Sequence, residues 1–181
     1  MRFSWEENHE KAIRYPDFLQ RGTGYCLLAC GLVLTISLSP ERTRVNPIKT
    51  FKVFGEPVEV LIPGEMTGGR STTLTQVSPP GGGPPPHSHQ NEDETFFVLE
   101  GEYEFLEAGQ WRRAAPGHAV QAMRGSVHTF RNVGATTGKM LVFVAPAGME
   151  KYLEEISVLF MPEDLSRLLA ISERYGILFP Q

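Results

Sequence analysis

Residues 79–86 read PPGGGPPP, and this block constrains the fold more than any other segment of the chain. A helix interior or a central strand rejects such a run, because proline lacks a backbone N–H and glycine weakens regular structure. The block is part of a wider excess, since the 181 residues include 18 glycines and 14 prolines, well above the usual ~12%. The composition therefore excludes an all-helical bundle and favours a turn-rich β protein.

Short β-prone segments recur from residue 46 onward, separated by glycine or proline turns. The strongest is 95–99, which reads TFFVL. The segments expected as strands are 57–62, 71–77, 95–99, 103–106, 111–114, 119–123, 127–132 and 139–145. Strands this short, with turns every ~8 to 12 residues, are typical of a β-sandwich or a β-barrel.

The C-terminal part, 147–181, is expected to be helical. Apolar residues within 149–156 fall at i, i+3, i+4 and i+7, which predicts one helix. A second helix is expected to open at 162–164 and to end at Gly176. We expect both helices to cover one face or one edge of the β domain, which spans 46–146.

Residues 1–45 differ from the rest and are expected to form an N-terminal extension outside the fold, with a segment packed on the domain as the alternative. They carry six basic and five acidic residues, whereas the remaining residues carry eleven and sixteen. Their apolar run, 25–38, is shorter than the ~20 residues that a transmembrane helix needs, but it has the length of a signal-peptide core. We expect a cytoplasmic protein without membrane contact, and export or membrane anchoring through 25–38 is the alternative.

Three histidines and one glutamate form the candidate functional group. His87 and His89 form an H-x-H, and residues i and i+2 of a strand point to the same side. Glu94 opens the next strand segment, and His128 begins another. Three imidazoles and a carboxylate can bind one divalent metal ion and leave positions open for water, substrate or dioxygen. Iron, manganese, nickel, copper and zinc all suit these donors, so the sequence does not name the metal.

The joint pattern resembles the two motifs of the cupin family. The first motif is matched throughout, by Gly81, His87, His89, Glu94 and Gly101. The second is matched by Gly117, Gly125, His128 and Asn132, with Met123 where a proline is expected. Because that proline stiffens a turn and binds no metal, the departure concerns loop geometry and leaves the metal ligands intact. The resemblance covers about residues 46–146, and the helical tail is similar to that of quercetinase-like single-domain cupins.

The resemblance implies an all-β fold, a cupin-type jelly-roll barrel with a C-terminal helical cap and the metal ion inside. It assigns His87, His89, Glu94 and His128 as the metal ligands. In quercetinase-like cupins the equivalent glutamate also acts as a general base, so Glu94 is the candidate catalytic residue, and a ligand-only role is the alternative.

Seven further side chains carry expectations. The expected pocket-lining residues are Phe96, Val98 and Phe130, with plain barrel core as the alternative. His118 is expected to be exposed and Asn132 to satisfy backbone groups at a turn. Glu92 and Asp93 are expected to be solvated, because they form an acidic turn with Glu94.

The implied function is that of a quercetin 2,3-dioxygenase-like enzyme, a metal-dependent oxidoreductase acting on a small aromatic or enolisable substrate. The alternatives are a non-redox metal-dependent isomerase or lyase, and a non-catalytic, metal-stabilised small-molecule-binding module. A small molecule is therefore the expected partner. Nucleic acid is not, because the net charge is −4 and no basic stripe is present to meet phosphates. A homodimer is left open, since small cupins often pair edge strands across two chains.

Overall fold

The computed structural model describes residues 47–180. The expected extension, 1–45, and its apolar run, 25–38, lie outside the described residues. Within the described part, none of the helices has both the length and the apolar character needed to cross a membrane.

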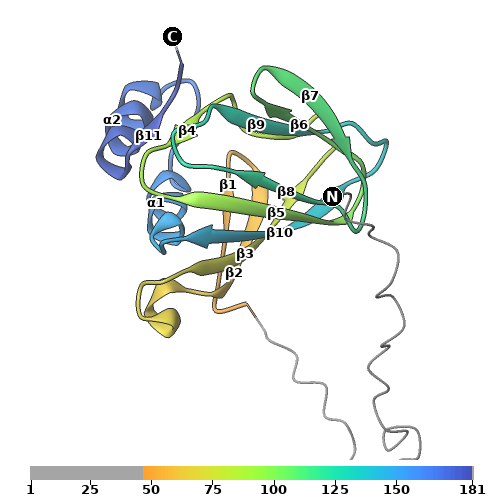
Figure 1. The fold of residues 1–181 in the computed structure, drawn as a ribbon. Coiled ribbons are helices and arrows are strands. Elements are labelled where there is room, and N and C mark those ends of the chain that lie inside the picture. The colour runs from red at the N-terminus through yellow and green to blue at the C-terminus, as the bar shows by residue number, and fades with distance from the viewer. Residues whose placement is uncertain (1–46, 181) are drawn as a thin grey trace, which may run out of the picture. The chain divides into compact units, whose positions relative to one another are not determined.

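The described chain is built from antiparallel strands followed by two helices (Figure 1). The elements are β1 (Lys49–Val53), β2 (Glu56–Ile62), the 3-10 helix η2 (Gly64–Thr67), β3 (Thr72–Ser78), β4 (Ser88–His89), β5 (Asp93–Glu100), β6 (Tyr103–Glu107), β7 (Gln110–Ala114), β8 (Ala119–Ala122), β9 (His128–Asn132), β10 (Gly138–Ala145), α1 (Met149–Ile156), α2 (Leu165–Tyr175) and β11 (Ile177–Leu178). Each segment expected as a strand overlaps one of these, and β4 falls in the H-x-H segment that was expected to be extended, whereas β1 and β11 were not expected.

The strands form three sheets that wrap into a jelly roll. Six strands pair in the order β1-β2-β3-β10-β5-β8, three in the order β7-β6-β9, and two as β11-β4. Figure 1 shows the six-stranded and three-stranded sheets as two layers, with α1, α2 and β11 together at one end. The expected all-β jelly roll with a C-terminal helical cap is therefore confirmed.

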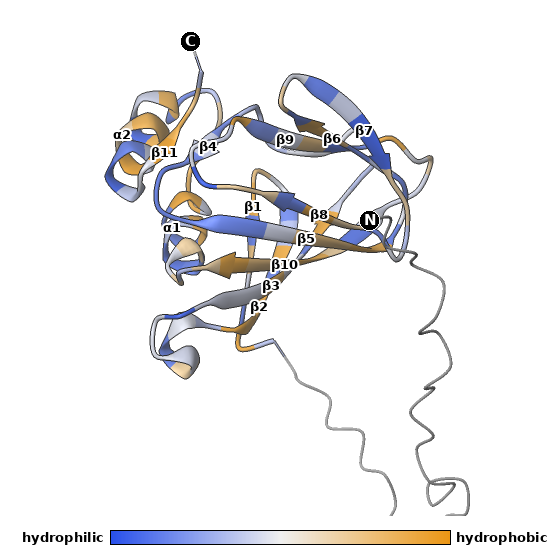
Figure 2. Ribbon diagram, viewed as in Figure 1, coloured by the Kyte–Doolittle hydropathy of each residue, from blue (hydrophilic) through white to orange (hydrophobic). Residues whose placement is uncertain are grey.

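Along the central strands, buried and exposed side chains alternate, and the buried ones form the interior of the barrel. On β5, Phe96 is 3% exposed, whereas its neighbour Phe97 is 40% exposed. β10 lies between β3 and β5, and Val142 pairs with both Leu74 and Phe96. Figure 2 shows β10 coloured mostly hydrophobic. An apolar side chain buried in this way stabilises the fold by about 1.5–3 kcal/mol.

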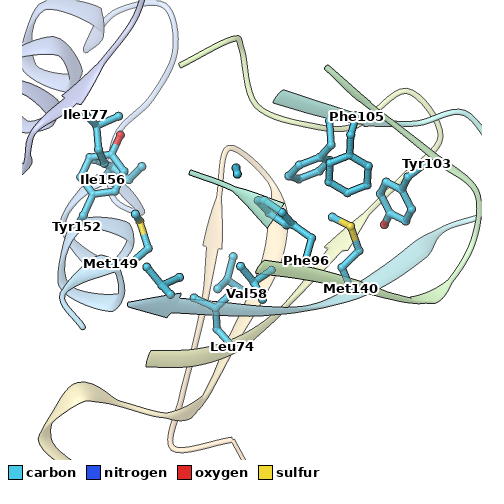
Figure 3. Packing of buried hydrophobic residues seen from close by; sticks show 14 of the residues in the cluster. Val58, Leu74, Phe96, Tyr103, Phe105, Met140, Met149, Tyr152, Ile156 and Ile177 are labelled. Carbon is cyan, nitrogen blue, oxygen red and sulfur yellow. The ribbon is translucent and has the colours of Figure 1, made fainter. Parts of the chain in front are cut away.

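The buried apolar residues form one cluster, and Figure 3 shows its aromatic end and its end at the C-terminal cap. At the aromatic end, the rings of Phe96, Tyr103, Phe105 and Phe130 lie between 5.3 and 6.3 Å apart in tilted or edge-on pairs. The other end consists mainly of α1 side chains together with Ile177. The sheets and the C-terminal cap therefore share one core.

The two helices are fixed to the barrel and to each other by polar contacts as well as by apolar ones. Tyr152 Oη lies 3.0 Å from Ser172 Oγ, which joins α1 to α2. Gly176 ends α2 with a φ of 75°, as expected. The start of α2 was expected at 162–164, but the helix begins at Leu165, because Asp164 N donates to Phe160 O and closes a separate turn.

Candidate metal centre

Backbone pairing places His87 and His128 side by side. His87 N donates to His128 O at 3.0 Å, and His128 N donates to His87 O at 2.8 Å. Side chains of residues directly opposite each other in an antiparallel pair project to the same side. The two imidazole centroids are accordingly 4.6 Å apart.

His89 and Glu94 complete the group, which we call the donor cluster (His87, His89, Glu94 and His128). His89 lies two residues after His87 and its ring centroid is 4.9 Å from that of His87. Glu94 faces inward from β5, and its Oε2 lies 3.1 Å from His128 Nε2 and 3.4 Å from His89 Nε2. One donor atom from each residue falls within 4.8 Å of all the others. The structure thus brings together the four side chains expected as metal ligands.

The outer nitrogen of each imidazole faces an acceptor. His87 Nδ1 lies 2.8 Å from Pro85 O, and His128 Nδ1 lies 3.0 Å from Ser126 O. His89 Nδ1 faces Glu92 Oε2 at 3.7 Å. An Nδ1–H held in this way leaves Nε2 with its lone pair, which is the form that binds a metal ion. The Nε2 atoms of His87 and His128 would therefore be their donor atoms toward a metal ion, and Glu92 facing His89 Nδ1 favours the same arrangement for His89.

The turn that carries the unexpected Met123 is held without the proline. Asp93 Oδ1 accepts a hydrogen bond from Arg124 N at 2.8 Å, and Asp93 Oδ2 accepts one from the guanidinium at 2.8 Å. Gly125 N donates to His89 O at 2.7 Å and has a φ of 77°, which glycine adopts readily. These bonds connect the turn before His128 directly to the segment that carries His89.

The electrostatics of the donor cluster suit a cation. Burial lowers the pKa of His87 to about 4, helped by the two neighbouring histidines, so this imidazole is neutral at pH 7. Burial also lowers the pKa of His89, but the carboxylates of Glu94 and Glu92 outweigh it and leave that pKa raised. Burial raises the pKa of Glu94, yet the facing histidines outweigh it and hold that pKa below its usual value.

The donor cluster fits a metal ion on its own chemistry. Both ring nitrogens of His89 are buried and have no hydrogen-bond partner. Buried polar atoms are normally paired, so such unpaired atoms call for an explanation, for example an ion. Three imidazoles and one carboxylate are donors that Fe, Mn, Ni, Cu and Zn accept. The four residues could hold a metal ion, whose identity the donor types do not determine.

A mostly apolar cavity adjoins the donor cluster. Its volume is about 130 Å³, and His87, His89 and Glu94 form part of its wall. Of the three residues expected to line a pocket, Phe96 and Phe130 do so. Val98 is fully buried and is not among the lining residues, because it lies two residues further along β5, within the core.

The C-terminal cap supplies much of the remaining cavity wall. Its lining residues are Met149, Tyr152, Leu153, Ile156, Leu168, Ile177 and Phe179. The sequence indicated that these helices cover the β domain, but not that they wall the cavity beside the donors. The apolar spacing in α1 and α2 predicted which side of each helix is buried, but it did not predict which barrel surface that side contacts.

The remaining expectations have mixed outcomes. His118 is exposed, as expected, and Asn132 donates to Ser78 O and Thr136 O, so it does serve backbone groups. The expectation of solvated acids is wrong for Glu92, which is 8% exposed. Gln90 N donates to Gly176 O, so the C-terminal tail covers this segment. An acid three residues after an H-x-H was the only sequence signal for Glu92.

The fold and the donor cluster define a jelly-roll protein with a His/Glu group able to bind a metal ion inside its barrel. Residues 74–144 match the family model described as the cupin domain, a range that includes all four donors. This match and the fold support the cupin superfamily for this domain. Comparison with curated protein sequences gave no match.

Solved structures share the fold. KdgF from Halomonas sp. is 18% identical with a TM-score of 0.51, and the similarity covers 57% of this chain and 90% of that chain. A predicted oxalate decarboxylase from Thermotoga maritima is 23% identical with a TM-score of 0.50, covering 57% of this chain and 95% of that chain. At these identities the similarity shows the cupin fold alone.

Proposed function

We propose that the protein is a metal-dependent, dioxygenase-like oxidoreductase that acts on a small aromatic or enolisable substrate. One observation carries the proposal: the donor cluster forms part of the wall of a mostly apolar cavity. A molecule in this cavity would present its polar edge to the donors and its apolar body to the phenylalanines. Cavities of this kind, with few convergent polar groups, are typical ligand sites.

The donors would hold a redox-active divalent ion, which when bound supplies dioxygen activation and acidifies a hydroxyl group placed beside it. The histidines contribute orientation, because Pro85 O and Ser126 O hold two of the rings by their Nδ1 atoms. Fixed rings lose little conformational entropy when the site is occupied.

Glu94 is proposed as the group that accepts a proton from the substrate hydroxyl. Its pKa is lowered in spite of burial, so the carboxylate is ionised at neutral pH and can act as a base. Oε2 already faces His89 and His128, which leaves Oε1 as the oxygen for the substrate. Phe96 and Phe130 on the same cavity wall exclude water from that proton transfer.

The test is oxygen uptake by protein reconstituted with each candidate metal and supplied with flavonols, catechols and other enediols. We expect uptake with at least one redox-active metal and one substrate class. His128→Ala should lose most of the bound metal and all of the uptake. The matched control is His118→Ala, since His118 is exposed and lies outside the donor cluster.

Other outcomes would contradict the proposal. Turnover without oxygen would favour the non-redox isomerase or lyase instead. A large loss of melting temperature on chelation, with no turnover of any substrate, would favour a metal-stabilised binding module. Full metal content in His128→Ala would show that the donor cluster is not the metal site.

A further inference from the structure

The polarity of the cavity limits what can enter it. Its lining, all within the described residues, contains no lysine or arginine, and its carboxylates are those of Glu56 and Glu94. Glu56 is already occupied: it accepts hydrogen bonds from Gly83 N, Ser78 Oγ and Gln76 Nε2. An anionic group placed away from the donor cluster would be buried without a counter-charge, at a high free-energy cost. The lining therefore favours a molecule that is neutral outside the part facing the donors.

The size of the cavity limits the ligand further. Its volume is about 130 Å³. An engineered apolar cavity of ~150 Å³ in another protein is large enough for benzene. The enclosed space therefore matches about one aromatic ring, fewer than the three rings of a flavonol.

One residue of the C-terminal tail lines this cavity close to a donor. β11 pairs with β4, so that Ile177 lies opposite His89 and Leu178 opposite Ser88. Phe179 follows immediately, lines the cavity, and its ring centroid is 6.3 Å from that of His87.

The tail is anchored immediately before Phe179. Gln90 N donates to Gly176 O at 2.8 Å, and Asn91 Nδ2 donates to Tyr175 O at 3.2 Å. Together with the β4–β11 pairing, these bonds hold the backbone that leads to Phe179 against the segment that carries His87 and His89. A side chain on a backbone held in this way can set the size of the cavity.

We propose that Phe179 is a specificity-determining residue that restricts the cavity to neutral molecules of about one ring. The proposal rests on the proposed function in one respect, namely that this cavity is the substrate site. It narrows the substrate class from flavonol-sized compounds to single-ring compounds with a metal-binding hydroxyl group.

The test is anaerobic binding to the zinc-loaded full chain, so that no oxidation takes place. The probes are catechol, the two-ring 2,3-dihydroxynaphthalene, and 3,4-dihydroxybenzoate, which adds a carboxylate to the single ring. The variant is Phe179→Ala. The matched control is Leu178→Ala, because Leu178 lies in the same tail but is 41% exposed and does not line the cavity. Zinc content is measured for every variant.

The unmodified protein should bind catechol at least about tenfold more tightly than either of the other probes. The two-ring probe is too large, since even one methylene group can change affinity ~10-fold or more. The carboxylate probe would bury a charge without a counter-charge. Phe179→Ala should bind the two-ring probe at least about tenfold more tightly than before, with zinc content unchanged. Leu178→Ala should behave like the unmodified protein.

Equal binding of one-ring and two-ring probes by the unmodified protein would overturn the proposal. So would a Phe179→Ala variant that keeps the original preference, or failure of catechol to bind at all. Catechol binding with the expected selectivity but without oxygen uptake after reconstitution with redox-active metals would refute only the proposed function.

Discussion

Glu92 Oε2 lies 3.7 Å from His89 Nδ1, and both atoms are buried without a hydrogen-bond partner. When His89 binds a metal ion through Nε2, its Nδ1 carries the proton and faces this carboxylate. A carboxylate behind a metal-binding histidine fixes the ring and increases its strength as a donor. Glu92 therefore faces Nδ1 of His89, just as the carbonyls of Pro85 and Ser126 face Nδ1 of His87 and His128.

The first prediction concerns metal affinity. Glu92→Ala should weaken zinc binding by about 10- to 100-fold, because His89 loses the group that orients it. Glu92→Gln should recover part of the affinity, since an amide oxygen still accepts a hydrogen bond. The measurement is competition with a chromophoric chelator. The control is Glu100→Ala, an exposed position on strand β5, which should bind zinc like the unmodified protein. Full zinc affinity in Glu92→Ala would refute the role assigned to Glu92.

The second prediction concerns the pH dependence of metal binding. The raised pKa of His89 means that, without metal, its imidazole keeps its proton to a higher pH than an ordinary histidine does, and a metal ion must displace that proton. Affinity should therefore fall by about tenfold per pH unit as the pH drops below that pKa, and level off above it. His87, with a pKa of about 4, stays neutral throughout this range and does not contribute. Calorimetric titration in two buffers of different ionisation enthalpy measures the released proton, and a pH-independent affinity would contradict the prediction.

The third prediction concerns Glu150, which joins α1 to the 3-10 helix η2 and to β3. Its carboxylate accepts hydrogen bonds from Gly64 N, Gly148 N and the hydroxyl of Thr72, and the residue is 5% exposed. Glu150→Ala leaves these buried donors unpaired and should lower the free energy of unfolding by about 3 kcal/mol, measured by urea denaturation.

The control for Glu150 lies on the same helix. Glu154 forms an exposed ion pair with Lys49 at 2.7 Å, so Glu154→Ala should cost no more than about 1 kcal/mol. Equal losses for the two variants would show that the buried contacts of Glu150 do not stabilise the fold.

The fourth prediction concerns acid stability. The side-chain and backbone hydrogen bonds from Arg124 lower the pKa of Asp93 to about 2. Because this pKa lies below that of the unfolded chain, the pair stabilises the fold above about pH 4, and the effect is lost as the pH falls toward 2. Asp93→Asn should therefore lower the melting temperature near neutral pH and show a smaller drop on acidification. Glu163→Gln, an exposed position, should keep the full acid-induced drop.

The sequence was informative about the donors because their geometry is local. The H-x-H spacing and the strand periodicity were enough to predict that His87 and His89 face the same side. That His128 would lie beside them came from the cupin resemblance, since the His87–His128 backbone pair joins segments far apart in the chain.

The cavity wall could not be predicted in the same way. Phe179 and Tyr152 reach the cavity through the packing of the C-terminal cap on the barrel, and neither has a spacing that relates it to the donors. β11 and β4 are two residues long, so they carry no periodicity that could identify them as partners. Val98 was expected on the wall because it shares a face of β5 with Phe96, but a shared face does not show how far along the barrel a cavity extends.

The position of β10 has a consequence for the kinetics of folding. This strand joins β3 to β5, so the six-stranded sheet stays in two parts until residues 138–145 enter between them. Pairings between segments so distant in the chain form slowly, on a scale of ~milliseconds to seconds. Until then, β3 and β5 each expose an unpaired edge that a second molecule can occupy. Recovery of the protein after denaturation is therefore a competition between the insertion of one strand and the association of two chains, and dilution favours insertion.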